Sequence, residues 1–266
     1  MRIAIGIEYD GRNFHGWETQ RSGGTVQQSV ESALSKVANT PIKTICAGRT
    51  DAGVHAVAQV AHFDCDAIRN ERSWIFGCNS NLPKSVSVLW ARQCDDKFHA
   101  RFSAERRYYQ YVILNRSVRP ATLNGRVSWE YQPLDEQAMA QAATYLTGEH
   151  DFSAYRAAGC GARHAVRRIY DLTVQRQGSF VFLNISANAF LQHMVRNIAG
   201  VLMAIGSGQQ SSQWAGDVLQ SKDRRCAAKT ASASGLYLTG VRYPQHYGLP
   251  APANDLDAWL GVLPGH

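Results

Sequence analysis

The order in which strand and helix patterns follow one another most constrains this fold, because that order occurs twice. Residues 2–9 alternate apolar with small or polar side chains, which is typical of a half-buried strand. Thr25 and Gln28 have the spacing of a capping box, and apolar residues at helical spacing follow them. The first half therefore predicts the order strand, helix, strand, strand, helix, strand. Its later elements are expected at 42–46, 56–63, 67–78 and 85–92.

The second half predicts the same order, although its sequence identity with the first half is negligible. Asp135 is a suitable N-cap for a helix, and Gln177-Gly178 is a hairpin signal between two later strands. The expected elements are a strand around 109–113, a helix at 135–147, strands at 168–176 and 179–187, a helix at 190–205 and a strand at 235–243.

Two successive βαββαβ patterns predict an α+β protein of two ferredoxin-like halves. Each half would carry an antiparallel sheet with helices packed on one face. We expect the first half at residues 1–104, the second at 105–245 and a C-terminal tail at 246–266. The open sheet faces, or the cleft between the halves, would then hold a ligand.

The charge of the chain leaves two interpretations open. Its 28 Lys and Arg residues exceed 21 Asp and Glu residues, which gives a formal net charge of +7. Such a surplus fits either a solvated surface or a polyanionic partner.

Several classes of protein do not fit the sequence. A charge follows Met1 at once, and no apolar run reaches the length of a membrane span, so we expect a cytoplasmic protein without a membrane segment. The six cysteines lie far apart, with no C-x-x-C pair and no clustered histidines, so neither a zinc site nor a disulfide framework is expected. No Walker-type loop, dinucleotide-binding glycine motif or Ser/His/Asp arrangement occurs.

Residues 48–56 hold the densest group of candidate functional residues. They fall in a loop between two predicted strands, where Asp, Thr and Gly alone indicate only a tight turn. Arg49 beside Asp51 favours a catalytic role over a simple turn, because a carboxylate held ionised by an arginine can act as a nucleophile or base. His55 adds a polar group to the same loop.

Other segments place cations among aromatic or apolar residues. Residues 101–111 interleave arginines with aromatics, which suits phosphates and unstacked bases but also an ordinary strand face. Arg196 lies in an otherwise apolar helix, where partial burial would require an acidic partner such as Asp51. A solvated helix face is the simpler alternative. Basic clusters at 163–168 and 222–225 would extend a phosphate-contacting track.

A series of motifs in collinear order covers residues 2 to about 244. They are Tyr9-Asp10-Gly11 with Phe14, Gly16 and Trp17, residues 48–56, 59–63, 81–83, 100–104, Arg107 with Tyr109 and Tyr111, residues 150–153, 188–191, 194–196 and 235–238. In these motifs the chain resembles the TruA family of bacterial tRNA pseudouridine synthases. It departs from the family at Glu18, His164, Lys229 and Ser232, where the family usually has glutamine or proline.

The resemblance implies a set of site residues. The family's catalytic aspartate corresponds to Asp51, its active-site tyrosine to Tyr109, and the arginine that pairs with the aspartate to Arg196. Leu236 corresponds to the leucine beside the carboxylate. We further expect Arg49, His55, Arg107 and Leu236 to bind the substrate.

The resemblance also implies an activity and an assembly. The family isomerises uridine to pseudouridine at positions 38–40, in the anticodon stem-loop of tRNA, as a homodimer and without a cofactor or metal. Its two ferredoxin-like halves form one extended antiparallel sheet with a central RNA-binding cleft, the pseudouridine synthase fold.

Two other functions compete with this interpretation. A non-catalytic RNA-binding protein could retain the fold, but the presence of Asp51 argues against it. A two-carboxylate glycosidase would need a second acid near Asp51, where the sequence has an arginine and a histidine instead. The sequence leaves open whether Asp51 attacks C1′, attacks uracil C6 or abstracts the C2′ proton.

Overall fold

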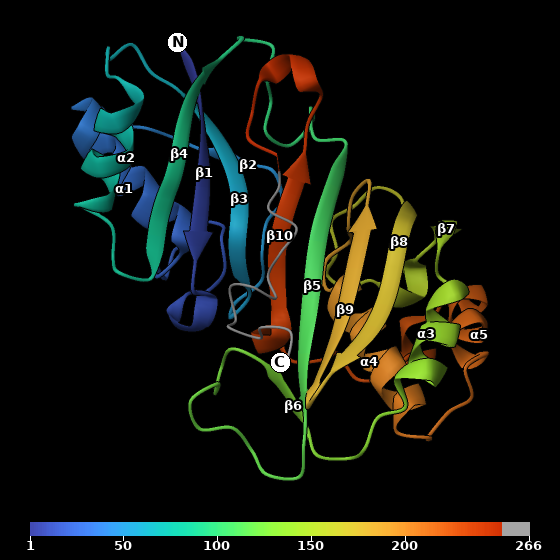
Figure 1. Cartoon of the computed structure of the whole chain (residues 1–266). Coiled ribbons are helices and arrows are strands. Elements are labelled where there is room, and N and C mark those ends of the chain that lie inside the picture. The colour runs from blue at the N-terminus through green and yellow to red at the C-terminus, as the bar shows by residue number, and fades with distance from the viewer. Residues whose placement is uncertain (252–266) are drawn as a thin grey trace. The chain divides into compact units, whose positions relative to one another are not determined.

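The computed structural model describes residues 1–251, which fall into two compact units (Figure 1). Unit 1 comprises Met1–Arg107 and the described residues from Tyr237 onward, and unit 2 comprises Tyr108–Leu236. The break after Arg107 lies close to the expected boundary after residue 104. The last strand is grouped with unit 1, whereas the sequence suggested the second half.

Unit 1 has the strand and helix order that the sequence predicts. Antiparallel pairing in the order β4-β1-β3-β2 gives a ferredoxin-like sheet, and α1 and α2 lie together on one side of it (Figure 1). The elements are β1 (Arg2–Tyr9), α1 (Val26–Ala38), β2 (Ile45–Cys46), β3 (His55–Asp64), α2 (Glu71–Asn79) and β4 (Val86–Cys94).

Local capping fixes where the helices of unit 1 begin. The Thr25 hydroxyl accepts a hydrogen bond from the Gln28 backbone N–H, which confirms the predicted cap. Helix α2 begins later than expected, because the Asn70 side chain caps it by accepting from the Ser73 N–H. Val26, Val30 and Leu34 of α1 are fully buried and supply its core face.

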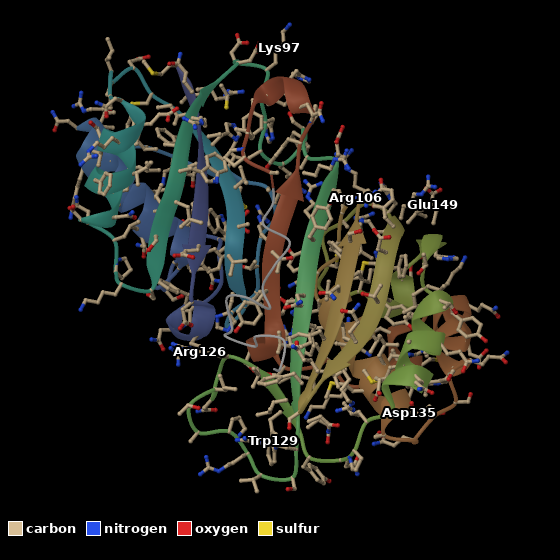
Figure 2. The ribbon with its side chains drawn as sticks, viewed as in Figure 1. Lys97, Arg106, Arg126, Trp129, Asp135 and Glu149 are labelled. Atoms are coloured by element: carbon tan, nitrogen blue, oxygen red, sulfur yellow. The ribbon has the colours of Figure 1, made fainter. Side chains whose placement is uncertain are left out.

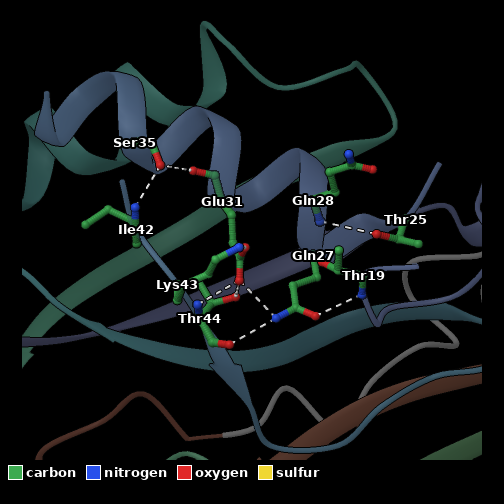
Figure 3. A network of polar contacts seen from close by, with 9 residues as sticks. All are labelled: Thr19, Thr25, Gln27, Gln28, Glu31, Ser35, Ile42, Lys43 and Thr44. Atoms are coloured by element: carbon green, nitrogen blue, oxygen red, sulfur yellow. Dashed lines mark hydrogen bonds and ion pairs between the residues drawn. The ribbon is translucent and has the colours of Figure 1, made fainter. Parts of the chain in front are cut away.

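A buried carboxylate fastens α1 to the segment before β2 (Figure 3). Glu31 is 6% exposed, and one of its carboxylate oxygens accepts from the Gln27 side chain and the Thr44 backbone N–H, both at 2.9 Å. The other accepts from Lys43 Nζ at 2.9 Å. Because each contact supplies a hydrogen-bond donor, these bonds offset the desolvation free energy of the buried carboxylate. The same bonds fix the position of α1 against the segment before β2.

Strand β10 (Leu236–Arg242) is the long-range element of unit 1. It pairs in parallel with β3, with Tyr237 opposite His55 and Leu238 opposite Ala56. Beyond it, Gln245–Tyr247 forms a short turn, and the Tyr247 ring meets the Phe98 ring edge-on at 5.1 Å. The expected tail at 246–266 thus includes Tyr247, which packs against unit 1, and its part at 252–266 lies outside the described residues.

Unit 2 also has the predicted main elements, and its hairpin is confirmed. Gly178 has a φ of +57° between the two hairpin strands, and Asp135 caps its helix as expected. The strands pair in the order β5-β9-β8-β7, with β6 parallel to β5. The elements are β5 (Arg106–Asn115), β6 (Ser128–Glu130), α3 (Glu136–Thr144), β7 (Gly148–Asp151), β8 (Val166–Gln177), β9 (Phe180–Ala187), α4 (Met194–Gly206) and α5 (Trp214–Ser221).

Helix α4 shows where the apolar periodicity was reliable and where it was not. Its stripe of Ile198, Val201 and Ile205 is buried, as predicted. The helix begins at Met194 and not at residue 190, because His193 takes a left-handed backbone conformation with a φ of +61°. None of the described helices has the length and apolarity that a bilayer crossing requires.

Candidate active site

The loop at 48–56 leads into β3 of unit 1, whose first residues are His55 and Ala56, and backbone contacts hold it against the segment that follows β1. The Trp17 N–H donates to the Thr50 carbonyl at 3.0 Å, and the Val54 N–H closes a turn onto the Asp51 carbonyl at 3.1 Å. Asp51 itself is half-buried. Its position is therefore set by the main chain on both sides.

Two glycines make this close approach possible. A Cβ on Gly11 would lie 1.9 Å from the Val54 carbonyl oxygen, and one on Gly16 would lie 2.7 Å from the Thr50 carbonyl oxygen. Gly16 also has a φ of +91°, which disfavours any side chain. The motif between residues 9 and 17 thus serves to shape the Asp51 loop.

A buried hydroxyl pair closes the base of the loop. The Tyr9 hydroxyl and Thr50 Oγ1 lie 2.7 Å apart, and both side chains are buried. The sequence placed Tyr9 in the first motif and Thr50 in the 48–56 loop, but it did not predict that their hydroxyls meet. The alternation of β1 puts Tyr9 on the core face.

His55 lies inside unit 1. It is 2% exposed, it receives the Gly11 N–H on Nδ1 at 3.1 Å, and it stacks on the Tyr237 ring at 4.6 Å. These contacts join the end of the loop to β10 and to the turn after β1. They favour a positioning role over direct contact with a substrate.

Arg107 is also buried, at 8% exposed, and it binds carbonyl oxygens of unit 1. Nη2 donates to the Ala47 carbonyl at 3.1 Å and to the Arg101 carbonyl at 2.5 Å, while Nη1 donates to Ala104 at 3.0 Å. The planar guanidinium fork suits several fixed acceptors at once. Arg107 therefore ties the start of the Asp51 loop to the turn at 99–103.

His62 of β3 anchors the same turn from the other side. It is 2% exposed, and its Nδ1 accepts the Ala100 N–H at 3.1 Å. Burial, and then the positive charge of Arg2, lower the pKa of His62 to about 4. The ring is therefore neutral at physiological pH and can keep this acceptor.

Arg49 differs from the buried residues of the loop. Its side chain is 65% exposed, and it forms an ion pair with Glu18 at 2.5 Å. Glu18 is one of the departures from the family pattern. An exposed pair of this kind exchanges partners at little cost, so Arg49 can turn to a phosphate.

The other expected site residues belong to unit 2. Tyr109 of β5 is 8% exposed, and its ring meets Phe190 edge-on at 5.0 Å. Arg196, in the first turn of α4, is half-buried as predicted, and its Nε donates to the Ala231 carbonyl at 2.9 Å. Leu236 is 6% exposed at the start of β10.

Both basic clusters of unit 2 keep exposed cations. Arg224 turns inward, where Nη2 donates to Asn197 Oδ1 at 3.1 Å. Arg225 pairs with Asp223 at 2.6 Å, but its side chain is exposed, as are those of Lys222, Arg163 and Arg168. Each cluster thus has two exposed cations that could meet a polyanion.

A further basic and aromatic segment was not singled out from the sequence. Trp129 is 40% exposed and Tyr131 is 61% exposed, with ring centroids 6.1 Å apart. Figure 2 shows Arg126 and Trp129 on the segment of unit 2 that joins β5 to α3. Strand β6 has only three residues, Ser128–Glu130, which is too short for an alternating pattern to stand out in the sequence.

Metal-ligating side chains and two of the cysteines were further candidates for a functional site. Within residues 1–251, no group of three His, Cys, Asp or Glu side chains is arranged to hold a metal ion. Burial raises the pKa of the Cys46 thiol, and that of the Cys78 thiol, to about 12. Neither thiol is therefore a nucleophile at neutral pH.

Comparison with known proteins gives a consistent result. Residues 5–103 and 142–244 match a family described as tRNA pseudouridine synthase. A protein of Nitrosococcus oceani named tRNA pseudouridine synthase A is 54% identical over 259 residues, which cover 97% of this chain and 100% of the relative. One of the same name from Idiomarina loihiensis is 51% identical over 262 residues, which cover 98% and 100%.

Among solved structures the likeness is distant. A chain in the structure titled "Crystal Structure of a Cbf5-Nop10-Gar1 Complex" aligns with 89% of this chain at 14% identity, with a TM-score of 0.37. This chain spans 48% of the length of that one.

We predict that Arg107→Met destabilises unit 1 and loosens the Asp51 loop. Removing the donors leaves buried carbonyl oxygens unsatisfied, so we expect the free energy of unfolding to fall by about 3 kcal/mol. Urea unfolding measures this loss, and amide hydrogen exchange should accelerate at residues 47–54. Arg49→Met removes an exposed arginine from the same loop and should change stability by less than about 0.5 kcal/mol. Equal effects of the two substitutions would contradict the anchoring role of Arg107.

We predict that His62 makes the protein less stable as the pH falls below its ordinary pKa of 6.5. Between pH 6.5 and 4 the unfolded chain binds a proton at this histidine and the folded protein does not. Stability is therefore full above this window and is lost through it. Between pH 7 and 5 the wild type should lose about 2 kcal/mol more than His62→Asn. Exposed His15, changed to Asn, is the control and should keep the wild-type pH dependence of urea unfolding.

Proposed function

Since the chain belongs to the tRNA pseudouridine synthase family, we infer that it isomerises uridine to pseudouridine in tRNA. The observation that carries this inference is the 54% identity to a tRNA pseudouridine synthase A, over 97% of this chain and 100% of the relative. The Asp51 loop and the glycines that shape it support the same reaction. We propose that the targets are the uridines at positions 38–40, in the anticodon stem-loop.

The reaction is an isomerisation that needs one activated carboxylate. The bond between N1 of uracil and C1′ breaks, the ring turns, and a bond forms between C5 and C1′. C5 loses its proton to the solvent, and N1 gains one, so no oxidant or co-substrate is consumed. We propose Asp51 as the catalytic residue that attacks C1′ or C6, or abstracts the C2′ proton.

Arg196 is our proposed partner for the Asp51 carboxylate. The support is the half-burial of a guanidinium on an apolar helix, because a buried cation is stable only with anionic or strongly polar partners. The hydrogen bond from Nε to the Ala231 carbonyl orients this side chain within unit 2. An arginine so oriented can hold a carboxylate ionised and in one direction.

Tyr109 and the exposed cations take the remaining roles in this proposal. A base in a stem must leave the stack before it reacts, which costs a few kcal/mol. We propose that Tyr109, whose ring is fixed by Phe190, stacks on the extruded uracil and helps remove the C5 proton. Arg49 would hold a phosphate. Leu236 would pack beside the carboxylate. We further propose that His55 and Arg107 act on the substrate through the loop that they position.

The proposal also covers the assembly and location of the enzyme. We expect a homodimer in the cytoplasm, where the tRNA substrate is found, and no bound cofactor or metal. Sedimentation of the purified protein measures the oligomeric state directly.

We predict that Asp51→Asn abolishes catalysis while RNA binding persists. A tRNA transcript labelled with tritium at uridine C5 releases its label only when C5 is substituted, so release reports the chemistry. The asparagine keeps the shape of the side chain but is neither a nucleophile nor a base, and we expect a loss of at least about a thousandfold. Glu18→Gln is the control, because it neutralises an exposed carboxylate near the same loop and should still release label. A wild-type protein that binds tRNA but releases no label would favour the non-catalytic alternative.

We predict that Arg196→Ala lowers kcat much more than it weakens tRNA binding. Loss of one positioned charge at a reacting centre typically costs about 100- to 1,000-fold in turnover. Single-turnover tritium release gives the rate, and filter binding gives the affinity. Arg168→Ala removes an exposed arginine of unit 2, and as the control it should weaken binding more than turnover. Equal losses of rate and affinity in Arg196→Ala would contradict its role as partner of Asp51.

A further inference from the structure

The turn at 99–103, which Arg107 and His62 anchor, presents a large aromatic side chain to solvent. Phe102 is 76% exposed, while its neighbours Phe98 and Ala100 are fully buried. A single exposed aromatic on a loose loop is common and does not indicate a binding site. Phe102 indicates one only if the turn that carries it is rigid.

Hydrogen bonds fix the turn from within. His99 Nδ1 accepts the backbone N–H groups of Arg101 at 3.2 Å and Phe102 at 3.1 Å. Ser103 Oγ accepts the His99 N–H at 3.0 Å, and the Ser103 N–H returns to the His99 carbonyl at 2.8 Å. The exposed ring therefore stands on a pre-ordered backbone, and little conformational entropy is lost when a ligand meets it.

Phe102 is part of a stack with two neighbours. The His99 ring lies 4.3 Å from the Phe102 ring with an interplanar angle of 29°, and the Arg101 guanidinium lies 5.5 Å from its centroid. Burial, and then the charge of Arg2, lower the pKa of His99, which favours the neutral ring whose Nδ1 accepts these N–H groups. Arg101 is exposed, so its guanidinium can move from the ring to another partner.

We propose that His99, Arg101 and Phe102 form a stacking platform for an unpaired base of the tRNA substrate. The Phe102 ring takes the face of the base, His99 supports it from behind, and Arg101 turns to the adjoining phosphate. This proposal rests on the proposed function for the identity of the RNA.

The chemistry of the platform favours a nucleotide over a protein surface. A base offers a flat π-face beside a negative charge, and the turn offers an aromatic ring beside an exposed arginine. Arg107 joins this turn to the start of the Asp51 loop through the carbonyls of Arg101 and Ala47. A base held here would thus be connected to the candidate catalytic loop by one buried side chain.

The chain offers a matched control. Phe76 of α2 is 57% exposed, and the Arg72 guanidinium lies 4.8 Å from its ring centroid. It is thus an exposed phenylalanine beside an arginine in the same unit, but no second ring stacks on it among the described residues. Both phenylalanines can be replaced by leucine with little risk to folding.

The test measures base stacking and affinity in protein carrying Asp51→Asn, which does not turn over the RNA. A set of anticodon stem-loops carries 2-aminopurine at each loop position in turn, because stacking quenches its fluorescence. We expect one position to be quenched, and Phe102→Leu to abolish this quench and raise the Kd about tenfold or more. Phe102→Tyr should restore both, and Phe76→Leu should match the unsubstituted protein.

Two results would overturn the platform. One is a Phe102→Leu protein that quenches and binds like Phe76→Leu. The other is a Phe102→Leu protein that binds RNA normally but sediments at a lower mass, which would place the ring against a second copy of the chain. Tritium release by the active enzyme is measured separately. If the active enzyme releases tritium but Phe102→Leu changes neither quenching nor Kd, the platform is wrong and the proposed function stands. If Phe102→Leu changes both but the enzyme releases no tritium, the platform stands and the proposed function is wrong.

Discussion

The buried guanidinium of Arg107 is the interaction on which the candidate site of unit 1 most depends. Its donors reach carbonyl oxygens of Ala47, Arg101 and Ala104, which belong to two separate loops. Hydrogen bonds to a charged group contribute more than neutral ones, and breaking them leaves buried acceptors unsatisfied. The loop that carries Asp51 and the turn that carries Phe102 are therefore not independent. A displacement of the loop or of the turn is therefore transmitted to the other through the Arg107 side chain.

Close backbone contact supplies the second constraint on the Asp51 loop. Gly11 and Gly16 leave no room for a Cβ against Val54 and Thr50, so the carboxylate is placed by main-chain packing. The hydroxyl pair of Tyr9 and Thr50 satisfies the polar groups that this packing buries. A catalytic carboxylate benefits from such a support, because the loop needs little reorganisation when substrate binds.

Local patterns predicted the elements whose formation depends on local physics. The Thr25 cap, the Asp135 cap and the buried stripe of α4 follow from hydrogen bonds and periodicity within one element. Strand β7 was missed, since its sequence of Gly, Glu, His and Asp has no apolar alternation. Helix α5 was missed because Gln213 provides no side-chain cap. The parallel pairing of β10 with β3 joins residues far apart in the chain, and no local signal encodes it.

The site residues divide along the same line. The sequence identified the 48–56 loop as a candidate site because it contains ionisable side chains, Arg49, Asp51 and His55, that can take part in catalysis. The burial of His55 and Arg107 depends on Tyr237, Gly11 and three carbonyls from elsewhere in unit 1, so the sequence suggested substrate contact where the geometry favours support.

The distribution of the arginines also changes what the net charge of +7 means. Arg107 and Arg224 bind carbonyl and amide oxygens of the fold, and Arg2 and Arg176 are held by Asp64 and Glu136. These cations hold the protein together and have few donors to offer a phosphate. A polyanion would instead meet exposed arginines such as Arg49, Arg101 and Arg163. Because each phosphate contact adds to the salt dependence of binding, the number of accessible lysines and arginines, and not the formal charge, sets that dependence.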